Sequence, residues 1–370
     1  MPRLAAITPL AAVPDSSERI SARRIAAAKK AFTTRRVNFD DIASLLTERA
    51  PETGDLVLAE ILAVGHHAKI EDVHGRRRQL HVGDTIIVAY GARYAPDQFD
   101  GIVPNDLGPC HLLAGGGIAG EVVARHDSTR PPTRILPLGL LGDRDGEVVN
   151  LKRYSLTKVG NVARVPMTLA IVGTSMNSGK TTVASSLIRG LTRAGLRVGA
   201  AKLTGTGSGG DVWSMLDAGA EQVLDFTDVG YATTHQADGE RLIEDSLSLL
   251  DHLAVAMPDV VVFEIADGLL QNETSLLLSA PELQARIDSI IFTAGDSLGA
   301  VAGIQWLIDR GLPLLGFSGL ITGSPLGTSE AERATGFPSF TLEQLGDPQF
   351  APKLCFSADA EVRLSLGRCV

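Results

Sequence analysis

The residues Gly173–Thr182, with the sequence GTSMNSGKTT, have the types and spacing of a loop that binds phosphate groups. Backbone N–H groups of such a loop surround phosphate oxygens, and the following helix N-terminus adds partial positive charge. Lys180 is expected to reach the β- and γ-phosphates of a nucleotide, and the Thr181 hydroxyl is expected to bind Mg²⁺. The apolar stretch Thr168–Val172 precedes the loop and a predicted helix follows it, as this motif requires. We therefore expect the nucleotide to contact Gly173, Thr174, Ser175, Met176, Asn177, Ser178, Gly179, Lys180, Thr181 and Thr182.

A second lysine, Lys202, lies near the end of the next predicted strand, Arg197–Leu203. Strand ends on this side of an open α/β sheet face the bound ligand, so Lys202 is expected to neutralise charge on a transferred phosphoryl group. The alternative is a strand-end lysine that points to solvent. The following glycines, Gly205–Gly210, also match the spacing of a dinucleotide-binding turn. Because the phosphate loop already occupies the first strand–helix turn, we interpret these glycines as a mobile substrate loop.

Three carboxylates follow the predicted strands. Glu264 ends an apolar strand and is expected to hold Mg²⁺ opposite Thr181. Asp211 is either a second Mg²⁺ ligand or the N-cap of the next helix, and the sequence leaves both open. Asp267, in the turn after Glu264, and His235, in a polar loop, are candidate contacts to a substrate, with a surface position as the alternative for the histidine.

These motifs, taken together, resemble dethiobiotin synthetase and its relatives. Gly173 lies one position earlier than the general phosphate-loop pattern requires, and that family has the same early glycine. In the family, the equivalent residues bind ATP and Mg²⁺ and stabilise phosphorylation of a carbamate. The resemblance implies these roles for Lys180, Thr181, Lys202, Asp211 and Glu264. It also implies that the Thr206 hydroxyl contacts the substrate.

A second resemblance covers Asn177–Lys202 together with Asp211–Ala220. These segments are similar to the molybdopterin-guanine dinucleotide biosynthesis adaptor protein, a GTP-binding relative. The shared features are the GKTT loop, a following lysine and a segment like Asp217–Ala220. The chain has no Asn-Lys-x-Asp sequence of the kind that reads guanine, which favours ATP.

The pattern of elements divides the chain into three parts. From Pro166, apolar strands alternate with helices, which predicts an α/β P-loop NTPase domain at 166–370 with a parallel sheet covered by helices on both faces. Short strands and regular turns over 54–165 predict a small all-β, barrel-like domain. Within it, Tyr90–Pro109 is predicted as a long loop that contains Arg93, Asp97 and Gln98, and long loops are functional or disordered.

Residues 1–53 are predicted to form a tail and a basic helix. Seven basic residues and no acidic residue lie between Arg19 and Arg36, and apolar residues recur there at near-helical spacing. Such a segment is either a solvated helix face or an arm that binds an anionic surface.

Composition excludes several classes of protein. Of the 370 residues, 44% are hydrophobic and 21% are charged, which is typical of a soluble globular protein. Apolar runs are of strand length, so we expect no membrane span and a cytoplasmic protein. The three cysteines predict neither a disulfide framework nor a metal site, and a formal charge of −9 makes nucleic acid an unexpected partner.

The sequence therefore predicts an ATP–Mg²⁺-dependent enzyme of the ligase or synthetase type. It would activate a small carboxylate, carbamate or similar group by phosphoryl transfer, and we expect a small-molecule substrate and a homodimer. Two alternatives stay open: a nucleotide-switched adaptor or chaperone in cofactor biosynthesis, and a kinase for a small metabolite.

Overall fold

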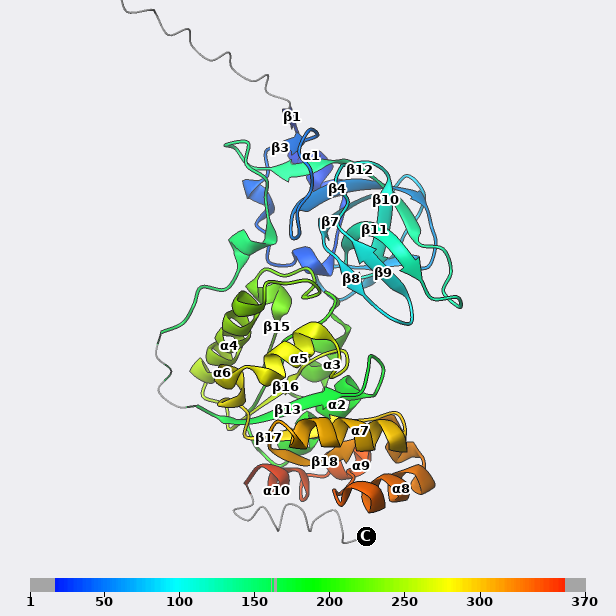
Figure 1. The fold of residues 1–370 in the computed structure, drawn as a ribbon. Helices are drawn as coiled ribbons and strands as arrows, with labels where there is room; N and C mark the ends of the chain where they lie inside the picture. The colour runs from blue at the N-terminus through cyan, green and yellow to red at the C-terminus, as the bar shows by residue number, and fades with distance from the viewer. Residues whose placement is uncertain (1–16, 161, 163–164, 357–370) are drawn as a thin grey trace, which may run out of the picture.

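A computed structural model of the chain describes residues 17–160, 162 and 165–356. The predicted tail before residue 17 lies outside this range. An N-terminal β region, residues 17–154, precedes a C-terminal α/β domain, residues 165–356, and Figure 1 shows them one above the other. The predicted boundary at residue 165 falls between the last element of the β region and the first strand of the α/β domain.

The α/β domain is built on a six-stranded sheet in which every pairing is parallel. Its strands are rich in Val, Ile, Leu, Ala and Phe, as expected when both faces of a sheet are buried. In spatial order they are β15 (Gln222–Asp225), β14 (Val198–Lys202), β16 (Val260–Glu264), β13 (Met167–Gly173), β17 (Ser289–Thr293) and β18 (Leu314–Ser318).

Helices cover both faces of this sheet, as predicted. Alternate residues of β13 show the two faces: Leu169 and Ile171 pack in one apolar cluster, and Ala170 and Val172 pack in the other. The first cluster includes α2 (Lys180–Arg193), α3 (Gly210–Asp217), α9 (Leu342–Leu345) and α10 (Ala351–Phe356). The second includes α4 (Gly239–Val255), α5 (Asn272–Ser279), α6 (Pro281–Gln284), α7 (Ser297–Ile308) and α8 (Pro325–Thr335).

The β region contains a mixed sheet of ten strands. The pairings run from β12 through β4, β7, β11 and β10 and return to β12, which closes a ring of five strands. The strands are β1 (Ser17–Arg19), β2 (Lys29–Lys30), β3 (Ser44–Leu46), β4 (Leu56–Ala63), β7 (Thr85–Tyr90), β8 (Arg93–Tyr94), β9 (Phe99–Ile102), β10 (Cys110–Ala114), β11 (Ile118–Arg125) and β12 (Thr133–Gly142). A separate hairpin consists of β5 (Lys69–Glu71) and β6 (Arg77–Gln79).

The basic segment forms a shorter helix than predicted. Helix α1 covers only Ala22–Ala27, and the strands on either side of it join the β-region sheet, where β1 pairs with β3 and β2 with β7. Phe32, one of the apolar residues at near-helical spacing, lies outside the helix and is fully buried in the turn η1 (Phe32–Thr34). Pairing with distant strands and burial therefore outweigh the local helical pattern.

The stretch Tyr90–Pro109 differs from the predicted single loop. It contains strands β8 and β9, which pair antiparallel and join the sheet through β11. This hairpin carries Arg93 at its start, beside the α/β domain. Regular pairing therefore fixes the position of the charged residues that the sequence showed in this stretch.

A buried ion pair joins the N-terminal segment to the α/β domain. The Arg35 guanidinium lies 2.9 Å from Asp225 Oδ1 and 2.7 Å from Asp228 Oδ2. Both carboxylates belong to the capping box of the turn η4 (Phe226–Val229), which follows β15.

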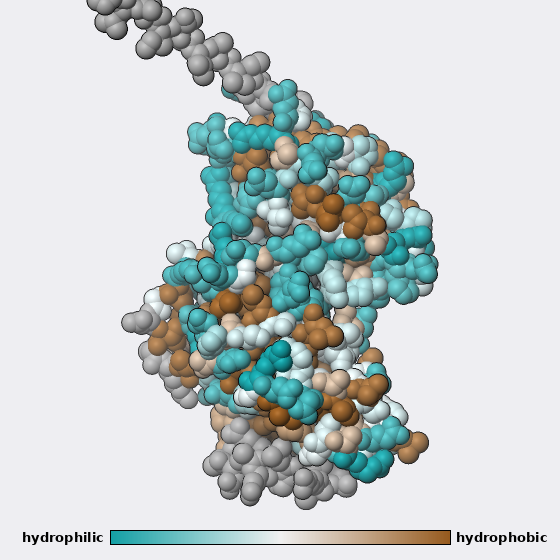
Figure 2. Space-filling view, viewed as in Figure 1, coloured by the Kyte–Doolittle hydropathy of each residue, from teal (hydrophilic) through white to brown (hydrophobic). Residues whose placement is uncertain are grey.

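Hydrophilic side chains cover much of the visible face of both regions (Figure 2). Within the described ranges, no helix has the length and apolar character to cross a membrane.

Candidate functional site

The phosphate loop lies between β13, which ends at Gly173, and α2, which begins at Lys180. Gly179 has a φ of 100° and Asn177 a φ of 65°, left-handed conformations that Gly and Asn tolerate best. The early glycine has a packing role, because a Cβ on Gly173 would lie 2.3 Å from Thr293 Oγ1 and 2.4 Å from Ser178 Oγ. The strand–loop–helix context predicted for the motif is therefore present.

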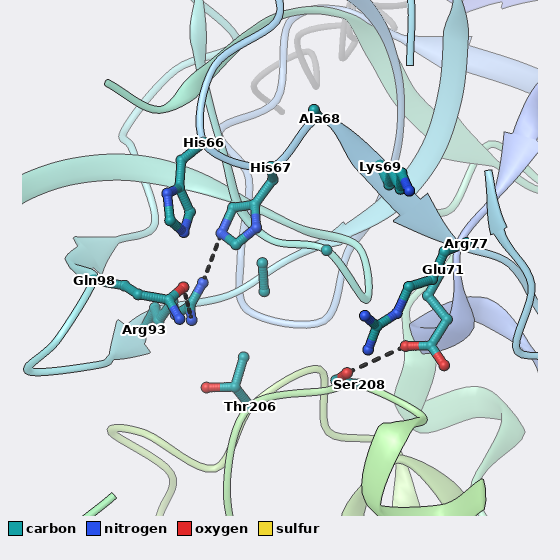
Figure 3. Close-up of a pocket in the computed structure, with 12 residues that line it drawn as sticks. His66, His67, Ala68, Lys69, Glu71, Arg77, Arg93, Gln98, Thr206 and Ser208 are labelled. Carbon is teal, nitrogen blue, oxygen red and sulfur yellow. Dashed lines mark hydrogen bonds between the residues drawn. The ribbon is translucent and has the colours of Figure 1, made fainter. Parts of the chain in front are cut away.

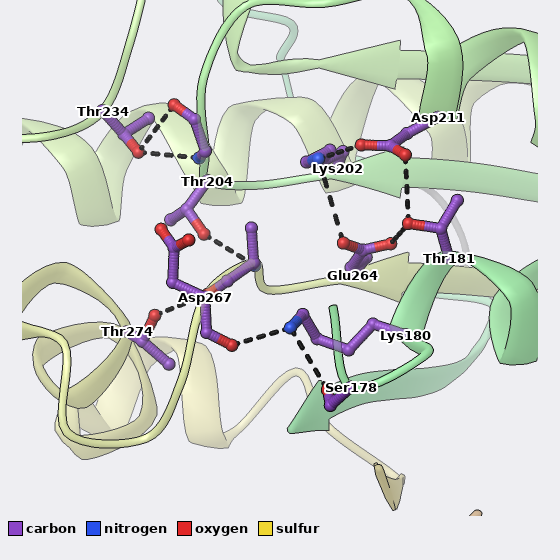
Figure 4. A network of polar contacts seen from close by, with 12 residues as sticks. Ser178, Lys180, Thr181, Lys202, Thr204, Asp211, Thr234, Glu264, Asp267 and Thr274 are labelled. Carbon is purple, nitrogen blue, oxygen red and sulfur yellow. Dashed lines mark hydrogen bonds and ion pairs between the residues drawn. The ribbon is translucent and has the colours of Figure 1, made fainter. Parts of the chain in front are cut away.

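The side chain of Lys180 is folded back into the loop (Figure 4). Its Nζ donates hydrogen bonds to the carbonyl oxygens of Ser175, at 2.8 Å, and Asp267, at 2.7 Å. The residue is 5% exposed, and this burial lowers the pKa of Lys180, although the carboxylates of Glu264 and Asp267 oppose the shift. Both acceptors are neutral, so the ammonium can donate instead to the oxygens of a bound phosphate.

Three oxygen-bearing side chains converge beside this lysine. Thr181 Oγ1 lies 3.0 Å from Asp211 Oδ1 and 2.9 Å from Glu264 Oε2. A hydroxyl has one proton, so it cannot satisfy both carboxylates at once. A hydroxyl with one or two carboxylates is the protein part of the usual Mg²⁺ site, where phosphates and water supply the remaining oxygens. The residues present therefore fit a Mg²⁺–nucleotide.

The second lysine belongs to the same cluster. Lys202 Nζ forms an ion pair with Asp211 and lies 3.9 Å from Glu264 Oε1 (Figure 4). Burial alone would lower the pKa of Lys202, but the two carboxylates outweigh it and hold the pKa above its usual range. The alternative of a lysine in solvent is wrong, because Lys202 is 9% exposed.

Asp211 is not the helix N-cap. Helix α3 begins at Gly210, its N-cap is Gly209, and Asp211 lies in the first turn with its carboxylate on Lys202 and Thr181. The glycine-rich loop before it is bonded on two sides. Gly207 N–H donates to the Ala232 carbonyl at 2.9 Å, and Gly209 N–H donates to Glu71 Oε2 of the β region at 3.0 Å.

Two of the three candidate substrate contacts share one cavity, and the third lies elsewhere. Asp267, with a φ of 63°, and Thr206 both line the cavity that contains the phosphate loop. Burial raises the pKa of Asp267, and the nearby Lys180 opposes the shift. His235 instead lines a neighbouring cavity, where its ring centroid lies 5.6 Å from that of Tyr94. His235 is therefore not among the residues that line the phosphate-loop cavity, although its ring is near enough to act on the carboxylate of Asp267.

The phosphate-loop cavity has a volume of about 460 Å³. Two of its lining residues, Arg93 and Gln98, come from the β region, and Asn177 Nδ2 of the loop donates to Asp97 Oδ2 at 2.9 Å. The sequence showed these residues as a charged stretch but gave no reason to place them opposite the phosphate loop. Within the described ranges, no group of three or more His, Cys, Asp or Glu side chains is arranged to hold a metal by itself.

Comparisons with known proteins match the α/β domain. Residues 168–265 match the family model described as molybdopterin guanine dinucleotide synthesis protein B, and this range contains Lys180, Lys202 and Glu264. Among curated proteins, no significant match is found.

Solved structures show only a partial likeness to this chain. The signal recognition particle receptor FtsY from Elizabethkingia anophelis in complex with GDP has a TM-score of 0.36 and 15% identity, over 55% of this chain and 68% of that chain. Signal Recognition Particle 54 kDa protein from Aeropyrum pernix K1 in complex with GDP has a TM-score of 0.33 and 21% identity, over 56% and 50%. The kinase domain of Escherichia coli tyrosine kinase ETK has a TM-score of 0.31 and 16% identity, over 42% and 67%.

The family match and the site geometry fall on the same residues. The match begins in β13, passes through the phosphate loop and ends just after β16, so it includes every element that brings the two lysines and two carboxylates together. The predicted resemblance to the molybdopterin-guanine dinucleotide family is confirmed over this range. The α/β domain is thus a P-loop NTPase domain, of a family whose members normally bind a nucleotide with Mg²⁺, and its residues 168–265 are similar to molybdopterin guanine dinucleotide synthesis protein B.

Proposed function

We propose that the chain is a Mg²⁺-dependent enzyme that activates a small carboxylate, carbamate or similar anion by phosphoryl transfer from a nucleoside triphosphate. The observation that carries this proposal is the second buried lysine. Lys180 and Thr181 are sufficient to bind a nucleotide, whereas Lys202 adds a fixed cation on the same carboxylate pair. A fixed cation in a buried site stabilises charge that develops during phosphoryl transfer.

The roles of the side chains follow from their positions. Lys180 and the loop backbone would hold the phosphates, and Thr181, Asp211 and Glu264 would hold Mg²⁺, because these side chains converge at the loop. When bound, Mg²⁺ would supply positive charge that offsets the charge of the phosphates. An acceptor oxygen forms a bond to the γ-phosphorus while the bond to the bridging oxygen breaks, and the nucleoside diphosphate leaves with that electron pair. The phosphorylated acceptor then reacts with a second group, as in a ligase.

ATP is the proposed nucleotide, because the guanine-reading sequence is absent from the chain. The second candidate function is a nucleotide-switched adaptor in cofactor biosynthesis. It is supported by the name of the matching family and by the hydrogen bond between Asn177 and Asp97, which links the phosphate loop to the β region. A change at the loop on hydrolysis would reach the β region through this bond.

Trapping of the activated acceptor tests the proposal. The protein is incubated with Mg²⁺, ATP or GTP, a mixture of small carboxylates and hydroxylamine, and products are identified by mass spectrometry. An acyl phosphate reacts with hydroxylamine, so we expect a hydroxamate together with nucleoside diphosphate and inorganic phosphate. A stable phosphorylated metabolite would instead show a kinase. Hydrolysis that no small acceptor stimulates would contradict the proposal and favour the adaptor.

A further inference from the structure

A second cavity, of about 510 Å³, lies between the β region and the glycine-rich loop of the P-loop domain. Figure 3 shows its walls, with strands β5 and β8 of the β region on one side and the loop that carries Thr206 and Ser208 on the other. Binding of the nucleotide and Mg²⁺ at the phosphate loop does not use this cavity. Its lining is nevertheless rich in cationic and polar side chains, which is a property of a site for an anion.

Three cations line the cavity: Lys69, Arg77 and Arg93. The one carboxylate in the lining is Glu71, and groups of the P-loop domain already donate hydrogen bonds to it. Glu71 accepts hydrogen bonds from Ser208 Oγ at 3.2 Å, Gly209 N at 3.0 Å and Trp213 Nε1 at 3.0 Å. The cavity therefore has a net positive charge, and its acid serves to join the two regions.

The two histidines in the lining do not change this balance. Burial and the nearby charge of Arg93 lower the pKa of His67 to about 3, and burial also lowers the pKa of His66. Both rings are therefore neutral near pH 7. A neutral ring donates or accepts a hydrogen bond but does not compete with the three cations for an anion.

Arg93 is the most informative of these cations. It is 6% exposed, and its hydrogen-bond acceptors are neutral: the Leu113 carbonyl and Gln98 Oε1 at 2.8 Å. The neutral ring of His67, with Nε2 at 3.0 Å from the guanidinium, shares the Leu113 carbonyl. Its Nε has no partner among the described residues, and no described carboxylate forms an ion pair with it. The carboxylates of Asp97 and Asp267 act on this guanidinium only from beyond ion-pair distance. A buried charge without a direct partner is costly, so its position favours an anion beside the guanidinium.

Arg93 also connects the two cavities. Together with Gln98 and Thr206 it lines both this cavity and the cavity of the phosphate loop. An anionic group beside Arg93 would thus lie at the boundary between the nucleotide phosphates and the rest of the second cavity. Lys69 and Arg77 lie on the hairpin β5–β6, on a different wall from Arg93 (Figure 3).

We propose that this second cavity binds the acceptor, a small molecule with two acidic groups, one against Arg93 and the other facing Lys69 and Arg77. The acidic groups are carboxylates or phosphates. The role of this molecule as the phosphoryl acceptor rests on the proposed phosphoryl-transfer function. The binding of a molecule with two acidic groups rests on the cavity alone. The acidic group against Arg93 is the one that accepts the phosphoryl group.

Binding of two simple anions tests this proposal. Succinate and inorganic phosphate are titrated, by calorimetry, into protein saturated with Mg²⁺ and a non-hydrolysable ATP analogue. The analogue occupies the phosphate loop, so the probes cannot bind there. We expect one probe or both to bind with a stoichiometry of one, and the monoanion butyrate to bind about tenfold more weakly than succinate. The probe that binds identifies the class of acid.

Variants assign the binding to the cavity. Arg93→Gln should abolish binding of the probe, and Lys69→Gln combined with Arg77→Gln should weaken it about tenfold. Arg76→Gln is the matched control, because Arg76 is exposed on the same hairpin turn and does not line the cavity. The affinity for the ATP analogue is measured in parallel for each variant.

Three results would overturn the proposal: neither probe binds to the saturated protein, the double variant binds as tightly as the unchanged protein, or the control variant loses binding equally. Failure of the ATP analogue to bind would instead remove the proposed phosphoryl-transfer function. The titration is then repeated without nucleotide, in the Lys180→Ala variant, so that the probes do not bind at the phosphate loop. This titration still decides whether the cavity binds a molecule with two acidic groups.

Discussion

Replacement of Lys202 by methionine is expected to lower turnover by about 10²–10³-fold, the effect of removing one preorganised donor from a buried site. The affinity for the nucleotide should change much less, because Lys180 and the loop backbone hold the phosphates. The apparent affinity for Mg²⁺, by contrast, should rise. Asp211 and Glu264 lose their shared cation, so less Mg²⁺ is needed for half-maximal activity. Steady-state kinetics with Mg²⁺ titration measure both effects.

The control for this experiment is Lys158→Met. Lys158 also forms an ion pair with an acid, Glu244, at 2.8 Å, but its side chain is 67% exposed. Its removal should leave turnover and Mg²⁺ dependence unchanged. Thermal denaturation of Lys202→Met shows whether the variant is folded at the assay temperature. A folded Lys202→Met protein with unchanged turnover would remove Lys202 from the mechanism.

Replacement of Arg35 by methionine is expected to lower the free energy of unfolding by about 3–5 kcal/mol, because it leaves buried carboxylates without their main partner. The side chains of Asp225 and Asp228 are 1% and 6% exposed, and each contacts the Arg35 guanidinium. Burial and the neighbouring Asp225 raise the pKa of Asp228, a sign that this acid is poorly solvated. Chemical denaturation measures the change.

Arg36 is a control one residue away. Its guanidinium lies 3.3 Å from Asp228 Oδ1, but its side chain is 35% exposed. Arg36→Met should therefore cost about 1 kcal/mol or less. If the Arg35 and Arg36 variants lose equal free energy of unfolding, burial does not determine how much the Arg35 ion pair contributes to stability.

The P-loop domain was predictable from the sequence because its signals are local. A glycine-rich loop between an apolar strand and a helix defines the site of Lys180 and Thr181 within a few residues. Strand ends of a parallel sheet meet at one edge, so Lys202 and Glu264 could also be placed near the loop. The structure brings these four side chains and Asp211 together.

The β region was less predictable because its pairings join residues far apart in the chain. Nothing local in Lys29–Lys30 indicates that it pairs with β7, and the basic segment was therefore assigned to a longer helix. Strand β12 (Thr133–Gly142) pairs with β3, β4 and β10, and no local pattern identifies these three partners. The position of Arg93 opposite the phosphate loop depends on these pairings, so sequence alone could show its charge but not its role.

The central claim is that Gly173–Thr182 binds the phosphates of a nucleotide. A crystal structure of the protein with Mg²⁺ and a saturating non-hydrolysable ATP analogue tests this claim most directly. We predict that the triphosphate lies in the loop, that Lys180 Nζ leaves the carbonyls of Ser175 and Asp267 to contact phosphate oxygens, and that Mg²⁺ lies at the Thr181 hydroxyl. A loop that remains without nucleotide, with Lys180 still on both carbonyls, would contradict the claim.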